Sequence, residues 1–168
     1  EMKLVHDGKP VSPKSPMTIE QLMSHTAGLT NGWHPENPVE LAYQKAELGR
    51  SADLDELISR LSALPLRFEP GTRYHYSVAT DVLGALVERL SGTTLETFFE
   101  NRIFRPLGMK DTFFNVPSEK LSRIASMHYW DPEGASIIAL RKDLVPLVTD
   151  VTLFSGAGGL LSTAKDYW

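Results

Sequence analysis

The segment from Pro70 to Gly84 reads PGTRYHYSVATDVLG. A proline-glycine turn opens it, and the spacing of the apolar residues that follow predicts a helix from about Ser77 to Ser91. A side chain at such a junction is held close to the positive end of the helix dipole, where a phenol can act as an acid or a base. Tyr76 is therefore a candidate catalytic residue. Its alternative role is that of a half-buried aromatic ring at the start of a helix.

Helical patterns lie on both sides of this segment. They predict a short helix that begins at the capping box of Thr18 and Gln21 and stops at Gly28, and helical turns over residues 41–48 after a loop at 30–40. They also predict a helix from its cap Asp53 to Pro65, and a further helix from a capping box of Thr93 and Glu96 to Pro106. Short connections between them indicate a helical subdomain over residues 18–108.

The two ends of the chain have a different character. Residues 1–17 read as an extended or loop lead-in. Residues 109–168 mix predicted strands at 112–114 and 126–130, a helical turn at 121–125, a structural glycine-rich turn at 155–159, and a final helix capped by Ser162 or Thr163. We therefore predict one partial α+β domain. Because the chain lacks a starting methionine and the final helix has barely begun at Trp168, we expect a piece excised from a longer protein.

Composition excludes several classes of function. The 168 residues are 42% hydrophobic and 23% charged, with a net charge of −4, so no basic face is expected for nucleic acid. No apolar run approaches the roughly 20 residues of a membrane span. Cysteine is absent and the five histidines form no metal-binding motif, so we expect neither a metal nor a cofactor. These features do not distinguish a cytoplasmic from a periplasmic location.

Five blocks of sequence together resemble a known family. They are LMSHTAGL at residues 22–29, PG followed by YS at 70–77, DVLG at 81–84, PLGMKDT at 106–112 and GGLLSTAKD at 158–166. In this order they are similar to β-lactamase-like serine hydrolases, which include class C β-lactamases, DD-peptidases of the penicillin-binding type and family VIII esterases. The resemblance implies the mostly helical subdomain of the β-lactamase/transpeptidase-like fold, without most of its central antiparallel sheet.

The resemblance also implies a mechanism in which an acyl-enzyme forms on the serine of an S-x-x-K motif upstream of the first block. The lysine keeps that serine ready for attack, and a tyrosine that matches Tyr76 shuttles the proton. A phenol is a poor base at neutral pH unless a nearby ammonium favours its charged form. In this chain only Ser162 and Lys165 match S-x-x-K, and they follow the tyrosine, where the family has no nucleophile. We therefore expect the isolated chain to be inactive.

The residue two positions after the tyrosine bears on the substrate. Val78 stands where the β-lactamases carry an asparagine that binds the acylamide carbonyl of the substrate, and valine cannot make that hydrogen bond. Family VIII esterases often keep Tyr-Ser and vary this third position, so we predict a carboxylesterase acting on a small-molecule ester. A β-lactamase, a DD-peptidase and a non-catalytic binder of acyl or peptidoglycan-type ligands remain open alternatives.

Three further residues are singled out beside the first block. The resemblance places Thr30 and Asn31 at the rim of the acyl pocket, with Asn31 as a candidate substrate-binding residue beside Val78. It gives His25 a structural role, with its ring bonded to backbone near Gly28. Self-association of the truncated domain is a further expectation.

Overall fold

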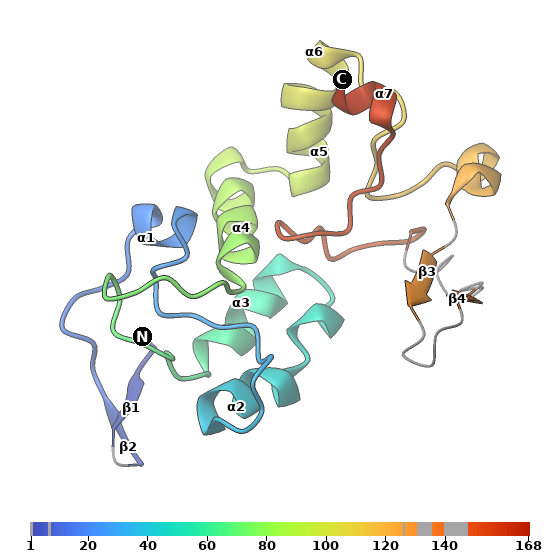
Figure 1. The fold of residues 1–168 in the computed structure, drawn as a ribbon. Helices are drawn as coiled ribbons and strands as arrows, with labels where there is room; N and C mark the ends of the chain where they lie inside the picture. Colours follow the sequence, from blue (N-terminus) through green and yellow to red (C-terminus); the bar gives the residue numbers. More distant parts are fainter. Residues whose placement is uncertain (1, 7, 126, 131–135, 140–147) are drawn as a thin grey trace.

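The structure is a computed structural model that describes residues 2–6, 8–125, 127–130, 136–139 and 148–168 (Figure 1). Its α-helices are α1 (Ile19–Met23), α2 (Pro38–Ala46), α3 (Leu54–Ser62), α4 (Ala79–Ser91), α5 (Leu95–Phe99), α6 (Arg105–Leu107) and α7 (Ala164–Tyr167). Tighter or wider turns are η1 (Leu48–Arg50), η2 (Glu100–Phe104) and η3 (Ser118–Arg123). Two antiparallel hairpins complete the described part: β1 (Leu4–His6) with β2 (Lys9–Val11), and β3 (Met127–Trp130) with β4 (Ser136–Ala139). The predicted α+β class is confirmed.

The helix ends follow capping chemistry at three predicted positions. The Thr18 hydroxyl accepts the Gln21 backbone N–H at 3.2 Å, and the Gln21 side chain accepts the Thr18 N–H at 3.0 Å, which completes the capping box. Asp53 accepts the Glu56 N–H at 2.8 Å at the start of α3. Gly92, with φ of 70°, ends α4 in the left-handed conformation.

Several predicted boundaries are wrong for local reasons. Helix α1 ends at Met23, well before Gly28. Helix α5 is capped by Thr94, which accepts the Thr97 N–H at 3.2 Å, and not by Thr93. Pro106 lies within α6, directly after the wider turn η2, and the backbone stays helical through it to Leu107, so it does not end the helical stretch.

The segments outside the helices differ more from expectation. The lead-in forms the β1–β2 hairpin, and the predicted loop at 30–40 ends at Asn37, whose side chain caps α2. The predicted strand at 112–114 is a single bridge between Phe113 and Leu161. The predicted turn at 121–125 is the η3 helix, which begins three residues earlier, at Ser118. Strand β3 matches the prediction for 127–130, whereas residue 126 lies outside the described residues.

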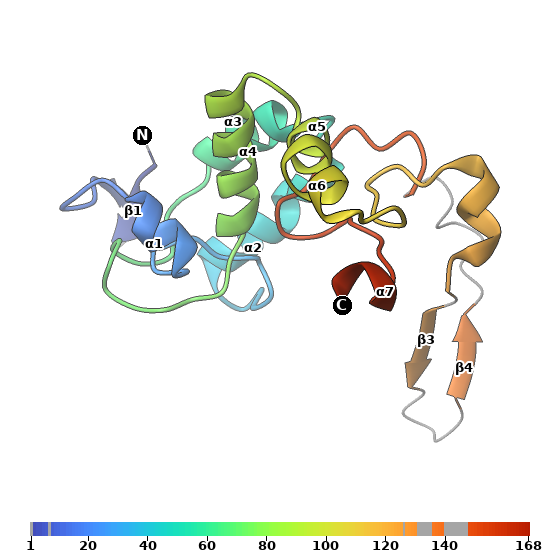
Figure 2. The same cartoon turned by 90° about the horizontal axis from the view of Figure 1, so that it is seen from above.

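Helix α4 is the centre of the helical part, with α1, α3 and α5 packed against it (Figures 1 and 2). The buried core beneath these helices is apolar and includes Leu22, Ala27, Leu29, Leu54, Leu57, Leu61, Leu66, Ala79 and Leu95. Leu90, in the last turn of α4, is 77% exposed and lies outside this core. None of the described helices has the length and hydropathy needed to cross a bilayer.

A C-terminal loop packs against the first turn of α4 and is hydrogen-bonded to it. Asp81 accepts hydrogen bonds from the Ser155 hydroxyl at 2.6 Å and from the Ala157 N–H at 3.2 Å. Gly156 lies so close to α4 that a Cβ there would stand 2.2 Å from the Thr80 carbonyl oxygen. The glycine-rich segment is therefore a structural turn, as predicted, and Asp81 holds it in place.

Candidate active site

The first two sequence blocks, together with the residues that flank them, form two segments, 22–30 and 67–78, that lie side by side and make up a frame for Tyr76. Backbone hydrogen bonds join them along their length: Arg67 N–H and Phe68 N–H to Gly28 O, Gly71 N–H to Thr26 O, His75 N–H to His25 O, and Val78 N–H to Thr30 O. Through these bonds the loop after α1 sets the position of the segment that leads into α4.

Gly28 is required by this frame. Its φ is 84°, a left-handed conformation that side-chain-bearing residues rarely adopt. A Cβ at this position would lie 2.2 Å from the Phe68 carbonyl oxygen, so the two segments could not approach as they do. Gly28, predicted to end the first helix, is instead a contact point between the two segments.

The Tyr76 ring lies at the surface of this frame and is 44% exposed. It stacks on Trp33 with ring centroids 5.5 Å apart and contacts the tilted His25 ring at 4.7 Å. Tyr74 also packs against His25, edge-on, with ring centroids 6.1 Å apart. Within the described residues the Tyr76 hydroxyl has no hydrogen-bond partner, so it is available to a group that approaches from outside.

His25 has a different environment from the one predicted. Its Nδ1 lies 3.4 Å from the Ser77 hydroxyl, and its ring lies against Tyr76, whereas the expectation placed the ring on backbone near Gly28. Its backbone φ is 53°, unusual for a residue with a side chain. The neighbouring frame keeps it there, because its carbonyl accepts the His75 N–H at 2.8 Å.

A cavity of about 320 Å³ begins beside Trp33. The two predicted substrate-binding residues, Asn31 and Val78, both line it. Tyr76 itself does not line the cavity; Trp33, which stacks on Tyr76, does. Thr30 is fully buried and bonded to His75, so its predicted place at the rim is wrong.

A buried polar cluster behind Tyr76 was not anticipated from the sequence. Glu40 of α2 is only 1% exposed, and its Oε1 lies 3.1 Å from His75 Nε2 and 3.6 Å from Arg67 Nε. The Thr30 hydroxyl lies 3.0 Å from the same His75 nitrogen. Burial raises the pKa of Glu40, but hydrogen bonds from Thr30 and His75 and the charge of His75 outweigh it, and the net pKa is lowered. The carboxylate is thus the ionised partner of these donors at neutral pH.

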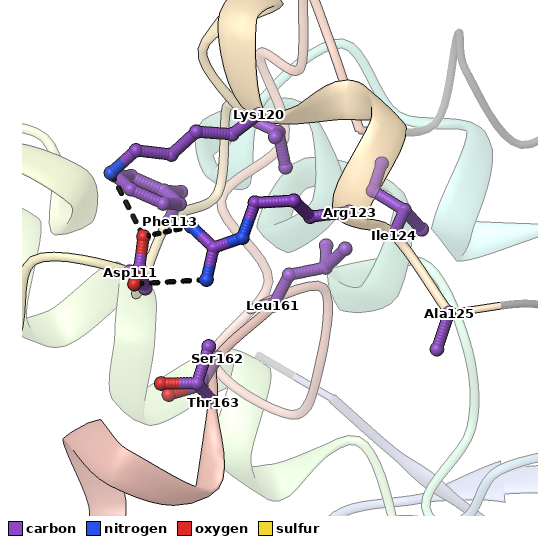
Figure 3. Close-up of a pocket in the computed structure, with 10 residues that line it drawn as sticks. Asp111, Phe113, Lys120, Arg123, Ile124, Ala125, Leu161, Ser162 and Thr163 are labelled. Carbon is purple, nitrogen blue, oxygen red and sulfur yellow. Dashed lines mark hydrogen bonds and ion pairs between the residues drawn. The ribbon is translucent and has the colours of Figure 1, made fainter.

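A second pocket, of about 310 Å³, is built by other elements (Figure 3). Asp111 lies between two cations there, 2.9 Å from Lys120 Nζ and 2.7 Å from Arg123 Nη1, and hydrogen bonds from these cations hold its pKa well below the usual range. The pocket is lined by residues between 111 and 116, by η3 and the two residues after it, and by residues 161–163. Helix η3, drawn in orange, lies on the far side of α5 from α1 in both overall views (Figures 1 and 2). The pocket is therefore separate from the Tyr76 frame.

The S-x-x-K match lies at this second pocket. Ser162 precedes α7, whose cap is Thr163, so Ser162 and Lys165 do not share a helix. The Ser162 hydroxyl lies 2.8 Å from the Thr112 hydroxyl, which donates to Asp166 at 2.8 Å. These bonds give Ser162 a structural partner. Across the described ranges, no cluster of three or more His, Asp or Glu side chains could hold a metal ion.

Known proteins are similar to this chain in fold and in sequence. The solved structure of EstCE1, a hydrolase with promiscuous acyltransferase activity, superposes with a TM-score of 0.70 and 28% identity, covering 98% of this chain and 46% of that one. Protein Rv1367c of Mycobacterium tuberculosis is 38% identical over 89% of this chain and 36% of its own length. Esterase EstB of Burkholderia gladioli is 37% identical over 70% of this chain and 30% of its own length.

The chain spans about a third of the length of these two curated relatives. The sequence profile of the Beta-lactamase family matches residues 7–168. This match takes in all five blocks noted in the sequence, together with both segments of the Tyr76 frame. The chain belongs to the Beta-lactamase family.

Proposed function

We propose that this chain supplies the proton-transferring tyrosine, Tyr76, of a carboxylesterase that works through an acyl-enzyme. The observation that carries the proposal is the half-exposed phenol of Tyr76 on a frame of backbone hydrogen bonds, with its ring stacked on Trp33, a residue that lines a cavity. The similarity to Esterase EstB supports ester hydrolysis as the reaction.

The reaction has two stages. Tyr76, as phenolate, takes the proton of a serine hydroxyl while the serine oxygen attacks the ester carbonyl carbon. The tetrahedral intermediate collapses, the bond to the alcohol breaks, and Tyr76 returns the proton to the departing alcohol oxygen. Water then attacks the acyl-serine with the same proton transfers and releases the carboxylic acid. A lysine ammonium near Tyr76 would favour the phenolate.

The serine and the lysine of this mechanism would come from outside the 168 residues. Ser162 is held by Thr112 at the pocket of Figure 3, which leaves Tyr76 without a nucleophile from this chain's only S-x-x-K match. We therefore expect a longer protein that adds an upstream S-x-x-K to hydrolyse p-nitrophenyl butyrate, and the 168 residues alone to be inactive. The same longer protein should show a lower kcat/KM with nitrocefin than with the ester. The reverse preference would make it a β-lactamase, and Tyr76-dependent turnover by the 168 residues alone would contradict the mechanism.

Substitution of Val78 by asparagine is expected to shift this preference toward nitrocefin. Val78 lines the cavity and precedes α4 without a side-chain cap bond, so asparagine, a good capping residue, fits there. Its amide can donate to an acylamide carbonyl, and one such bond corresponds to about a tenfold gain in kcat/KM for nitrocefin relative to the ester. The measurement is the ratio of the two kcat/KM values in the longer protein.

The matched control is Val78→Thr, which keeps the shape of valine and can cap α4 but has no amide. Its ratio should stay within about twofold of the parent value, well under the gain from one hydrogen bond. An equal shift for threonine and asparagine would mean that capping of α4, and not contact with the substrate, sets the preference.

A further inference from the structure

Tyr76 is held in place by its ring and its backbone. Its ring contacts Trp33 and His25, and its hydroxyl has no hydrogen bond within the part of the chain that the structure describes. Trp33 is itself largely exposed, so one of these two neighbours offers little restraint. The position of the phenol therefore depends on the backbone that carries it, and consecutive Cα atoms are only 3.8 Å apart.

The residue before Tyr76 is anchored on three sides. The His75 backbone N–H donates to the His25 carbonyl at 2.8 Å. Its ring packs edge-on against Phe68 at 5.1 Å. Its Nε2 lies 3.1 Å from Glu40 Oε1 and 3.0 Å from the Thr30 hydroxyl. In this way the side chain of His75 ties the Tyr76 segment to α2.

The buried charge of Glu40 makes the link between His75 and α2 resist displacement. A buried carboxylate is costly unless it is paired and hydrogen-bonded, and Glu40 is almost completely buried. Among the described residues its Oε2 has no hydrogen-bond partner, so the contacts of Oε1 carry most of its compensation. Any movement of His75 away from α2 takes a donor from this carboxylate. The charge therefore opposes displacement of the segment that carries Tyr76.

We propose that Glu40 and His75 are positioning residues for Tyr76, acting through the buried hydrogen bond between Glu40 Oε1 and His75 Nε2. Neither side chain touches the substrate; they keep the phenol at the distance that proton transfer needs. The catalytic consequence rests on the proposed esterase function, whereas the structural consequence at Tyr76 does not.

The test compares two carboxylate-to-amide substitutions in the longer protein. Glu40→Gln keeps the shape of the side chain and removes its charge. It is expected to lower kcat for p-nitrophenyl butyrate by roughly 10- to 100-fold with KM changed less than about twofold, because small misplacements of catalytic groups have effects of this size. Asp166→Asn is the matched control, since Asp166 also accepts two described hydrogen bonds but lies on α7, away from Tyr76. It should leave kcat unchanged at a temperature where both variants are fully folded.

A rescue experiment addresses His75 directly. His75→Leu removes the donor to Glu40 and should reproduce the loss in kcat. His75→Gln places an amide N–H near the position of Nε2 and should recover most of it. Equal losses for leucine and glutamine, or an equal loss in Asp166→Asn, would overturn the positioning role.

A spectroscopic readout is independent of turnover. With 13Cζ-labelled tyrosine, the Tyr76 resonance, assigned by its absence in Tyr76→Phe, should move in Glu40→Gln and stay in place in Asp166→Asn. If the longer protein hydrolyses no ester, the proposed function fails while this resonance still decides the positioning role. An unmoved Tyr76 resonance in folded Glu40→Gln would overturn the inference, whatever the activity.

Discussion

Replacement of Tyr76 by phenylalanine is expected to lower kcat/KM for p-nitrophenyl butyrate by about 10²- to 10⁴-fold, the range that general acid–base catalysis contributes. The substitution removes one oxygen atom, and within the described residues that oxygen makes no hydrogen bond. The ring contacts with Trp33 and His25 need no hydroxyl and should persist. The loss should therefore be chemical, with an unfolding midpoint close to that of the parent protein.

The control for this prediction lies two residues away. Tyr74 is more exposed than Tyr76 and contacts His25 edge-on, so Tyr74→Phe removes a similar hydroxyl from the same aromatic group. We expect its activity to stay within about twofold of the parent value, since substitutions at exposed sites without special roles have small effects. A loss of less than tenfold in Tyr76→Phe, or equal losses in both variants, would remove Tyr76 from the mechanism.

Gly28→Ala is expected to be the most destabilising of the substitutions considered. The new Cβ would stand 2.2 Å from the Phe68 carbonyl oxygen, at a φ of 84°. Because that neighbour is backbone, it cannot rotate away, and the two segments of the Tyr76 frame must separate. We expect a loss of about 3 kcal/mol or more in the free energy of unfolding, from left-handed strain and from the displaced backbone.

Gly92→Ala separates these two causes. Gly92 also has a positive φ, of 70°, but a Cβ there would meet nothing within 4 Å. Its substitution should cost only about 1 kcal/mol, the strain of the left-handed conformation alone. Urea unfolding followed by circular dichroism measures both values. Equal losses in the free energy of unfolding for the two substitutions would show that the close approach of residue 28 to the Phe68 carbonyl adds nothing to the destabilisation.

Local chemistry is what the sequence predicts well. Thr18 and Asp53 cap helices because a side-chain oxygen beside free N–H groups needs only its neighbours in sequence. The α+β class and the family follow from blocks whose order is visible in one chain. The fully buried Thr30, expected at a rim, shows the limit, since its burial depends on α2 and His75.

The Glu40–His75 pair lies beyond that limit. The two residues are 35 positions apart, and a glutamate on a short helix reads as a surface charge unless the packing of that helix is known. One signal was present, namely a histidine directly before the candidate tyrosine. The same limit applies to residues 112–114, where an apolar run predicted a strand but only Phe113 has a bridge partner, at Leu161.

Four of the five sequence blocks meet in pairs. The first two form the Tyr76 frame. The fourth and fifth join where Asp166 accepts the Asp111 N–H at 2.7 Å and the Thr112 hydroxyl at 2.8 Å. Much of the family resemblance therefore reflects contacts between blocks, and Tyr76 is the one residue of the five blocks that we propose to act on a substrate.

The loop that packs against the first turn of α4 has a consequence for how this chain folds. Asp81 receives its donors from residues 74 and 76 positions later, whereas the caps of α1 and α3 come from the same turn. Bringing residues so distant in sequence together lowers the conformational entropy of the chain before any contact forms to offset the loss, and contacts of large sequence separation slow folding. We therefore expect the first turn of α4, which begins at Ala79, to be completed late, when the C-terminal segment returns. A chain still emerging from the ribosome would have α1 and α3 within reach but not the finished support of its candidate catalytic residue.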